Sequence, residues 1–294
     1  MWFSFLVGLA VGSFINVLVF RLNPQRQDQV FNLLKIIKGR SYCFSCQKTL
    51  QWYELIPILS FLVQQGRCRS CQAKLSWQYP LVELITGIGF TLVYWRLVNF
   101  SGLKLVLGNW FFAYLIFWWL VIFVLIAIAI FDFKYYLIPS FLLDFLIILG
   151  IGINIFYFFQ KSFFFKTGVY FSENYFYLFG QDSWLTRLLP AVALGSATIG
   201  LAYLFSRGRA MGLGDLWLVL GLGLIFGWPD ILWVLILSFV FGTLVSLILI
   251  GLKRKTFKDI IPFGPFLALG AMTMFLFGAK ILSVYFNLFP NLFF

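Results

Sequence analysis

The stretch Met211-Gly212-Leu213-Gly214-Asp215-Leu216-Trp217 places one carboxylate, flanked by glycines, between two long apolar runs. An acidic group at the edge of a bilayer is costly to hold there, so Asp215 is a candidate functional residue. A second carboxylate, Asp132, lies in a similar setting at the end of an earlier apolar run. We therefore expect the two aspartates to meet at one face of a membrane.

The composition indicates an integral membrane protein. The 294 residues are 62% hydrophobic and 11% charged, whereas a soluble domain is about half apolar and a quarter charged. Several apolar runs are long enough to cross about 30 Å of hydrocarbon. We expect the first run to remain as a helix, because it lacks the basic start and the small-residue cleavage site of a signal peptide.

These patterns predict an all-α polytopic membrane protein with about eight transmembrane helices and one small polar loop domain. The predicted spans are residues 1–20, 81–97, 109–131, 137–159, 188–205, 215–226, 231–252 and 261–288. Asp132–Tyr136 is predicted to be a polar break between two spans. The corresponding domains are the first helix at 1–20, the loop at 21–80 and a multi-helix membrane domain at 81–294.

The positive charge of the chain predicts its orientation. If the amino terminus lies outside and the spans alternate, sixteen of the 22 Lys and Arg residues fall on the cytoplasmic side. Both aspartates and the loop at 21–80 then face the cytoplasm. The net charge of +12 is explained by anionic lipid headgroups, so the bilayer is expected as a partner and nucleic acid is not.

All four cysteines lie in the loop at 21–80, as Cys43-Phe-Ser-Cys46 and Cys68-Arg-Ser-Cys71. Two CxxC pairs separated by 21 residues are typical of a structural zinc site with four thiolate ligands. Disulfides are disfavoured because the loop is predicted to lie in a reducing compartment. A redox role is disfavoured because no thioredoxin-like pattern surrounds either pair.

Carboxylate chemistry is favoured because the chain contains no histidine, which excludes Ser-His and Cys-His nucleophiles. Two carboxylates brought together at a membrane face share one proton, so that one activates water and the other polarises a carbonyl. Gly212 and Gly214 are expected to let the backbone approach a substrate and to tolerate unusual dihedrals. The alternative is that each aspartate forms an ion pair with Lys134, Arg207 or Arg209.

Two further polar features have structural interpretations. Gly8, Gly12, Ser13 and Asn16 form a small, polar stripe along the first span, which predicts a helix-packing face. Asp230 is expected to be solvated on the outer side of the membrane.

Several stretches resemble the bacterial type IV prepilin peptidase family, which are membrane aspartyl proteases of the GxGD type. The matching stretches, in chain order, are Gly12–Leu22, Glu54–Ser60, Gly66–Arg69, Tyr79–Leu84, Asp132–Pro139, Met211–Asp215 and Ile261–Pro265. The chain departs from the family at Trp217, where Lys is frequent, and at Ser140, where an acidic residue or Asn is frequent.

The resemblance implies a catalytic pair, Asp132 and Asp215, supported by Gly212, Gly214 and Pro139. It implies that the domain at 81–294 is a peptidase in the bacterial cytoplasmic (inner) membrane. The expected substrates are prepilins and pseudopilins, whose basic leader is cut just before a hydrophobic helix.

Many members of this family also N-methylate the new terminal residue with S-adenosylmethionine. For this chain, that cofactor is implied by the resemblance alone. Glu83, near the start of the second span, is expected either to pair with a loop Arg or to contribute to the methylation site.

Two other classes remain as alternatives. A transporter could use Asp132 and Asp215 for ion coupling, although the halves of the chain show no convincing repeat. A presenilin-like protease shares Gly-Leu-Gly-Asp, but this chain has Phe131 where such proteases usually have Tyr and lacks their Pro-Ala-Leu stretch near the end.

Overall fold

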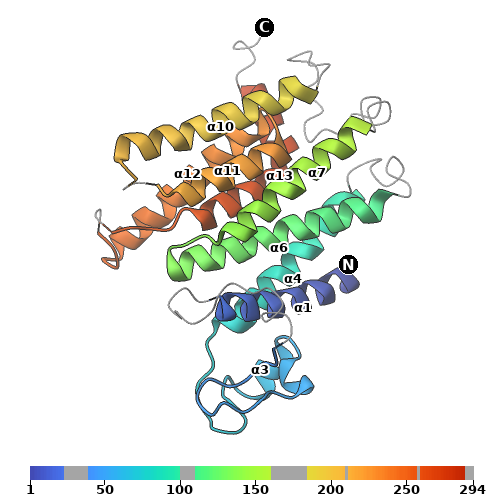
Figure 1. Ribbon diagram of the computed structural model, residues 1–294, viewed down its shortest axis with the longest axis vertical. Coiled ribbons are helices and arrows are strands. Elements are labelled where there is room, and N and C mark those ends of the chain that lie inside the picture. Colours follow the sequence, from blue (N-terminus) through green and yellow to red (C-terminus); the bar gives the residue numbers. More distant parts are fainter. Residues whose placement is uncertain (23–38, 100–109, 160–183, 209–210, 257–258, 289–294) are drawn as a thin grey trace. The chain divides into compact units, whose positions relative to one another are not determined.

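The computed structural model describes residues 1–22, 39–99, 110–159, 184–208, 211–256 and 259–288. Eight longer helices and two short ones form the regular structure of these residues (Figure 1). The longer helices are α1 (Trp2–Arg21), α4 (Gln78–Asn99), α6 (Phe111–Tyr135), α7 (Ser140–Phe159), α10 (Trp184–Ser206), α11 (Leu213–Phe226), α12 (Asp230–Gly251) and α13 (Gly264–Leu288). The short helices, η1 (Trp52–Leu55) and α3 (Leu59–Val63), belong to the cysteine-containing segment.

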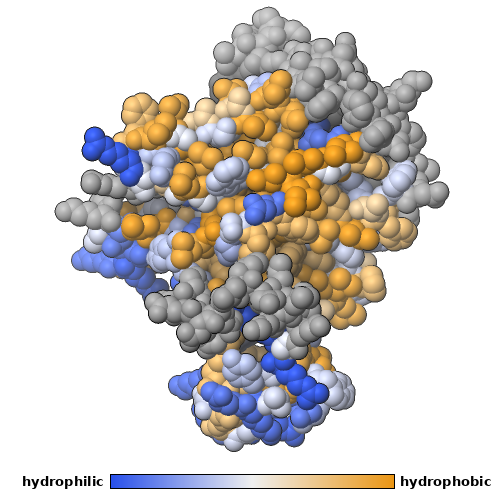
Figure 2. Space-filling model, in the orientation of Figure 1, coloured by the Kyte–Doolittle hydropathy of each residue, from blue (hydrophilic) through white to orange (hydrophobic). Residues whose placement is uncertain are grey.

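The predicted all-α polytopic fold is confirmed. Six of the helices, α1, α4, α6, α10, α12 and α13, are long and apolar enough to cross a membrane, and α7 and α11 contain shorter apolar stretches. Large apolar side chains such as Phe112, Ile148 and Leu244 are exposed on these helices. Figure 2 shows hydrophobic residues over the visible helical surface and hydrophilic residues gathered on the cysteine-containing segment. This distribution suits helices whose outer faces contact lipid.

The chain forms two compact units, and their boundary lies within α6. The first unit contains α1, the cysteine-containing segment, α4 and α6 as far as Phe123. The second begins at Val124 and includes the helices from α7 to α13. Within the first unit, α4 packs against α1.

The small-residue stripe of α1 is the packing face that the sequence predicts. A Cβ atom added at Gly8 would lie 2.7 Å from the Cα of Gly87, and one added at Gly12 would lie 2.6 Å from the Cα of Glu83. Only glycine allows backbones this close. The stripe therefore sets the distance between α1 and α4.

The second unit surrounds the short helix α11. α7 and α10 both pack against α11, while α12 packs against α13 (Figure 1). A Cβ at Gly221 would meet Leu146 of α7 at 3.0 Å, and one at Gly223 would meet the carbonyl oxygen of Ala191 of α10 at 3.2 Å. Asn154 of α7 donates a hydrogen bond to the carbonyl of Leu224 at 2.7 Å. Contacts on two sides thus hold a helix of only 14 residues.

Two predictions about acidic residues are wrong. The polar break was placed at Asp132–Tyr136, but α6 continues through Asp132 to Tyr135, and the chain turns at Tyr136 with φ 54°. Asp230 is 4% exposed rather than solvated. It interacts electrostatically with Arg187, whose guanidinium donates to the carbonyl of Phe226 at 2.6 Å. A nearby cation and the first turn of α12 compensate for this burial.

Candidate functional site

Asp132 lies in the last turn of α6 and is 7% exposed. Its Oδ2 accepts a hydrogen bond of 2.8 Å from the backbone N–H of Gly264, the first residue of α13. A Cβ at residue 264 would lie 2.7 Å from that same oxygen. Glycine therefore lets the start of α13 approach the carboxylate closely. The sequence singled out Ile261–Pro265 as a stretch but did not assign this role to Gly264.

Asp215 is the third residue of α11 and is 8% exposed. Its Oδ2 accepts the backbone N–H of Gly212 at 3.1 Å. This bond satisfies a backbone donor at the helix start, as in a capping box. The helix N-terminus also favours a negative charge at this position. The local fold of the Gly-Leu-Gly-Asp motif therefore fixes the carboxylate.

The two carboxylates belong to the same unit and interact electrostatically. Each uses one oxygen to accept one backbone N–H. The expected alternative, an ion pair with Lys134 or Arg207, is absent among the residues that the structure describes. Arg209 lies outside them. Two buried acids without cationic partners are suited to sharing a proton.

The backbone is ordinary at Gly212 and closely packed at Gly214. Gly212 has φ −87° and ψ 158°, which any residue adopts, so the prediction of unusual dihedrals is wrong there. Gly214 faces Ile138, whose Cβ would lie 3.3 Å from an added Cβ. Pro139 accepts the N–H of Leu142 at 3.1 Å as α7 begins. Gly214 thus packs the stretch Met211–Asp215 against the stretch Asp132–Pro139.

The four cysteines come together as the sequence predicts. One ligand atom from each of Cys43, Cys46, Cys68 and Cys71 lies within 4.8 Å of the others. The sulfurs of Cys43 and Cys71 are 3.7 Å apart. A tetrahedral site with Zn–S bonds of about 2.3 Å requires sulfurs about 3.8 Å apart. The cluster can therefore hold a metal ion.

The two cysteine turns have the same backbone structure. The N–H of Cys43 donates to Lys48, and that of Cys68 donates to Ala73, at 3.0 and 2.8 Å. Gln47 and Gln72 each have φ 57° at the same position of their turns. This repeated backbone geometry directs both pairs of thiols toward one another.

Backbone donors also prepare the thiols for a metal. Hydrogen bonds from the N–H groups of Cys71 and Ser70 lower the pKa of Cys68 to about 7. The pKa of Cys71 rises to about 11, because burial and the neighbouring thiols outweigh a backbone hydrogen bond from Ala73. Cys68 therefore loses its proton before Cys71 does. Metal ligation needs the thiolate form.

Glu83 is buried in α4, with 7% exposed. Its Oε2 accepts the N–H of Ile58 at 2.8 Å, and Ser13 also donates to the carboxylate. No Arg of the described loop forms an ion pair with it, so the expected pairing is absent there. Glu83 instead ties the cysteine-containing segment to α1 and α4.

Comparisons with known proteins cover most of the chain. Residues 6–97 match the Bacterial Peptidase A24 N-terminal domain, and residues 119–247 match the Type IV leader peptidase family. The prepilin leader peptidase/N-methyltransferase of Aeromonas salmonicida is 30% identical, over 96% of this chain and 92% of the relative. The relative with the same name in Legionella pneumophila is 28% identical over 97% of this chain and 95% of its own length. The one in Bacillus subtilis is 28% identical over 96% of this chain and 96% of its own length. No solved structure gives a significant match.

Proposed function

The chain belongs to the type IV leader peptidase family, and on that premise we propose that Asp132 and Asp215 are its catalytic pair. The protein is a multi-pass membrane endopeptidase that removes the leader peptides of prepilins. One observation carries the proposal for the two residues. They are buried carboxylates in one unit that interact with each other and have no cation beside them among the described residues.

The proposed mechanism uses the pair as one unit holding one proton. The unprotonated carboxylate takes a proton from water, and the resulting hydroxide attacks the scissile carbonyl carbon. The protonated partner donates a hydrogen bond to the carbonyl oxygen and stabilises the tetrahedral intermediate. Proton transfer to the leaving amine then breaks the C–N bond. The pair titrates together, so the proton belongs to both residues.

The backbone donors support this role by orienting the carboxylates. Gly264 and Gly212 each bind the Oδ2 atom of one aspartate. The remaining oxygen of each side chain can then face water or the substrate carbonyl. Fixing reactive groups in this way removes the entropy cost of aligning them during the reaction.

A prepilin cleavage assay in detergent tests the assignment. Asp132→Asn and Asp215→Asn should each abolish cleavage, because the amide neither activates water nor shares the proton. Asp144→Asn is the matched control, since Asp144 is exposed on α7. Retention of the wild-type rate by either active-site variant contradicts the assignment.

The orientation proposed for the protein places its amino terminus outside and the aspartates at the cytoplasmic face. The distribution of Lys and Arg supports it. A prepilin leader lies on that same side. Protease treatment of inverted membrane vesicles should cut within the cysteine-containing segment, whereas intact spheroplasts should protect it.

The metal that we propose for the cysteine cluster is zinc. Zinc prefers four thiolates in a tetrahedron, and the 3.7 Å between the sulfurs of Cys43 and Cys71 matches that geometry. Four thiolate ligands leave no open position for water. The ion is therefore structural. It would hold a segment whose regular elements are only four and five residues long.

A second activity, N-methylation of the new amino terminus, is supported by the names of the relatives. S-adenosylmethionine would supply an electrophilic methyl group on a positively charged sulfur. Release of methylated mature pilin, measured by mass spectrometry after cleavage, tests this part of the proposal.

A further inference from the structure

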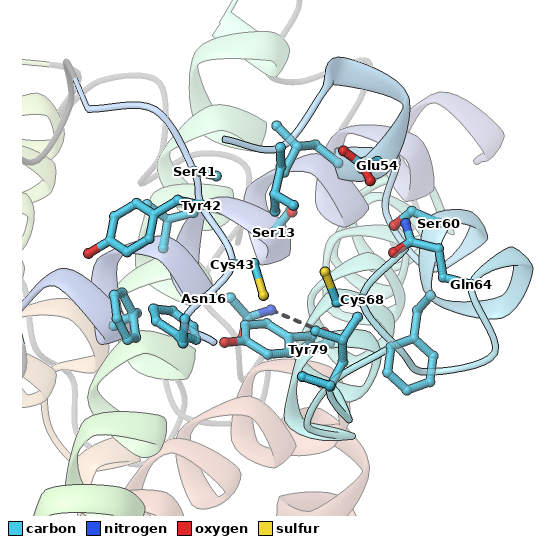
Figure 3. Close-up of a pocket in the computed structure, with 18 of the residues that line it drawn as sticks. Ser13, Asn16, Ser41, Tyr42, Cys43, Glu54, Ser60, Gln64, Cys68 and Tyr79 are labelled. Atoms are coloured by element: carbon cyan, nitrogen blue, oxygen red, sulfur yellow. Dashed lines mark hydrogen bonds between the residues drawn. The ribbon is translucent and has the colours of Figure 1, made fainter. Parts of the chain in front are cut away.

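The short helix α3 presents an uncovered apolar surface. Its residues Leu59, Leu62 and Val63 are 59%, 59% and 82% exposed. The other side of α3 faces the interior of the cysteine-containing segment, where Ser60 and Gln64 line a cavity (Figure 3). Apolar helix faces are normally buried against another surface. Most of the outward face of α3 is left uncovered by the residues that the structure describes.

Two tryptophans extend this surface. Trp52 belongs to η1, which packs against α3, and Trp77 lies just before α4; they are 76% and 68% exposed. Trp52 packs edge-on against Tyr53 at 5.8 Å, and Trp77 lies 5.0 Å from Phe61, the buried residue of α3. Tryptophan and tyrosine are enriched where a membrane meets water, because their rings are apolar and carry a polar edge. The exposed residues form what we call the α3 patch: Trp52, Leu59, Leu62, Val63 and Trp77.

The segment that carries the patch is attached to one face of the membrane at both ends. α1 and α4 are each long and apolar enough to cross a bilayer. They run antiparallel, because Gly8 lies against Gly87 and Gly12 against Glu83. The end of α1 and the start of α4 therefore lie at the same face. The chain between them, including the described residues 39–77, begins and ends there.

A hydrogen bond holds the start of α3 at the depth of the membrane surface. Ile58 immediately precedes α3, and its N–H donates to Oε2 of Glu83 at 2.8 Å. Glu83 is five residues into α4, which is about 7.5 Å along a helix about 33 Å long. The hydrocarbon of a bilayer is about 30 Å thick. Ile58 has φ 60°, a costly conformation for a β-branched residue, so the surrounding structure fixes this point firmly.

The charges around the patch are mostly positive. Residues 39–77 contain five Lys or Arg residues and a single acid, Glu54. Arg67 and Arg69 follow α3 closely and are exposed, and the guanidinium of Arg69 lies over the ring of Tyr53 at 5.5 Å. Anionic lipid headgroups attract such residues. A basic leader peptide would be repelled by the same charges, which disfavours the substrate as the occupant.

We propose that the α3 patch docks onto the anionic lipid surface at the face where α1 ends and α4 begins. Leu59, Leu62 and Val63 enter the boundary between headgroups and acyl chains, and the two tryptophans lie at headgroup level. Arg67 and Arg69 contact lipid phosphates. The cysteine-containing segment thus gains a membrane contact of its own, in addition to the helices that cross the bilayer.

Photolabelling of the full-length wild-type protein in nanodiscs tests the docking without any variant. The probe is a phosphatidylcholine with a diazirine in its acyl chain, in a bilayer of phosphatidylcholine and phosphatidylglycerol. Mass spectrometry should find label on α3 and Trp52 as well as on α1 and α4. Label on α1 and α4 alone overturns the proposal. A cross-link from α3 to residues 124–294, to a second copy or to prepilin also overturns it, because a protein surface is then the occupant.

The lipid composition tests the choice of an anionic surface. In a bilayer of phosphatidylcholine alone, label on α3 should fall by about fivefold for each Lys or Arg that contacts headgroups. Equal labelling in the two bilayers contradicts the role given to Arg67 and Arg69.

A double variant tests the apolar side chains. Leu62→Gln together with Val63→Gln should reduce the label on Trp52 by about tenfold or more, because two exposed apolar side chains lose their favourable transfer into lipid. Zinc content and the rate of prepilin cleavage in detergent should stay unchanged, which shows that the protein remains folded. The matched control is Leu252→Gln with Ile260→Gln, which removes two apolar residues of the second unit that are 61% and 69% exposed. Equal labelling of Trp52 in the two double variants overturns the proposal.

Discussion

Replacing Gly264 with alanine tests whether a backbone contact holds Asp132 in its reactive position. The added Cβ would lie 2.7 Å from Oδ2 of Asp132 and 3.3 Å from its Cβ and Cγ. Gly264 does not adopt a left-handed conformation, so alanine is not excluded by the backbone itself. The oxygen belongs to the end of a rotatable side chain. The carboxylate should therefore move, and the helix should remain in place.

The expected loss follows from the size of that movement. A carbon–oxygen contact relaxes to about 3.2–3.4 Å, so the carboxylate must shift by roughly 0.5 Å or more. The shift weakens the 2.8 Å bond from the N–H of Gly264. A hydrogen bond to a charged group contributes about 1.5–3 kcal/mol, and each 1.36 kcal/mol is about tenfold in rate. We expect kcat/KM for prepilin cleavage to fall about 10- to 100-fold, with little change in thermal stability.

The matched control is Gly152→Ala in α7, where an added Cβ meets nothing within 4 Å. That variant should cleave at the wild-type rate and should be slightly more stable, because alanine favours a helix. Both variants are compared in initial-rate cleavage assays and in thermal unfolding followed by fluorescence. If Gly264→Ala cleaves as fast as Gly152→Ala, the contact with Asp132 does not position a catalytic group. A large loss of stability would instead show that α13 itself had moved.

Four further predictions concern the supporting structure. Changing both Cys43 and Cys68 to Ser should reduce metal content, measured by elemental analysis, from about one zinc per chain to none. Wild-type protein should release its zinc as the pH falls, because protons compete for the thiolates. Gly12→Leu should lower the melting temperature in detergent by several degrees, because the leucine side chain forces α1 away from α4. An unchanged melting temperature would show that the helices separate freely. Asp230→Ala should lower the melting temperature by several degrees, because Asp230 is buried at the start of α12 and interacts electrostatically with Arg187, and Arg187→Met in the same protein should recover part of the loss.

The number and order of the helices were predictable because each apolar run must satisfy its backbone internally and match the thickness of the bilayer. Their ends were less predictable. The first aspartate was read as the start of a break, yet α6 runs to Tyr135. Polar residues can occupy the last turn of a helix at the interface, so hydropathy marks the edge of the hydrocarbon rather than the end of the helix. The burial of Asp230 was not predictable from local sequence either, because the cation that interacts with it, Arg187, is 43 residues away.

The two aspartates show which parts of a site a sequence can reveal. Asp215 receives its backbone donor from Gly212, three residues earlier, so the motif contains the whole local arrangement. Asp132 receives its donor from Gly264, 132 residues later. The stretch Asp132–Pro139 gives no sign that Gly264 is the partner of Asp132. The stretch Ile261–Pro265 was visible as a match, but only the packing of α13 shows why a glycine stands there.

The same difference explains why the polar contacts of α1 and α4 were not predicted. Asn16 fits the small-residue stripe of α1, and packing alone accounts for its spacing. Its Nδ2 donates to the carbonyl of Tyr79, 63 residues away, and its Oδ1 has no partner within the part of the chain that the structure describes. Glu83 likewise owes its orientation to Ile58, in a segment that the cysteines hold. A stripe that brings two helices together therefore also carries, at Asn16, a polar group that packing leaves unsatisfied. Such a group can be recognised only when its neighbours in the fold are known, because the spacing of the stripe gives no sign of it.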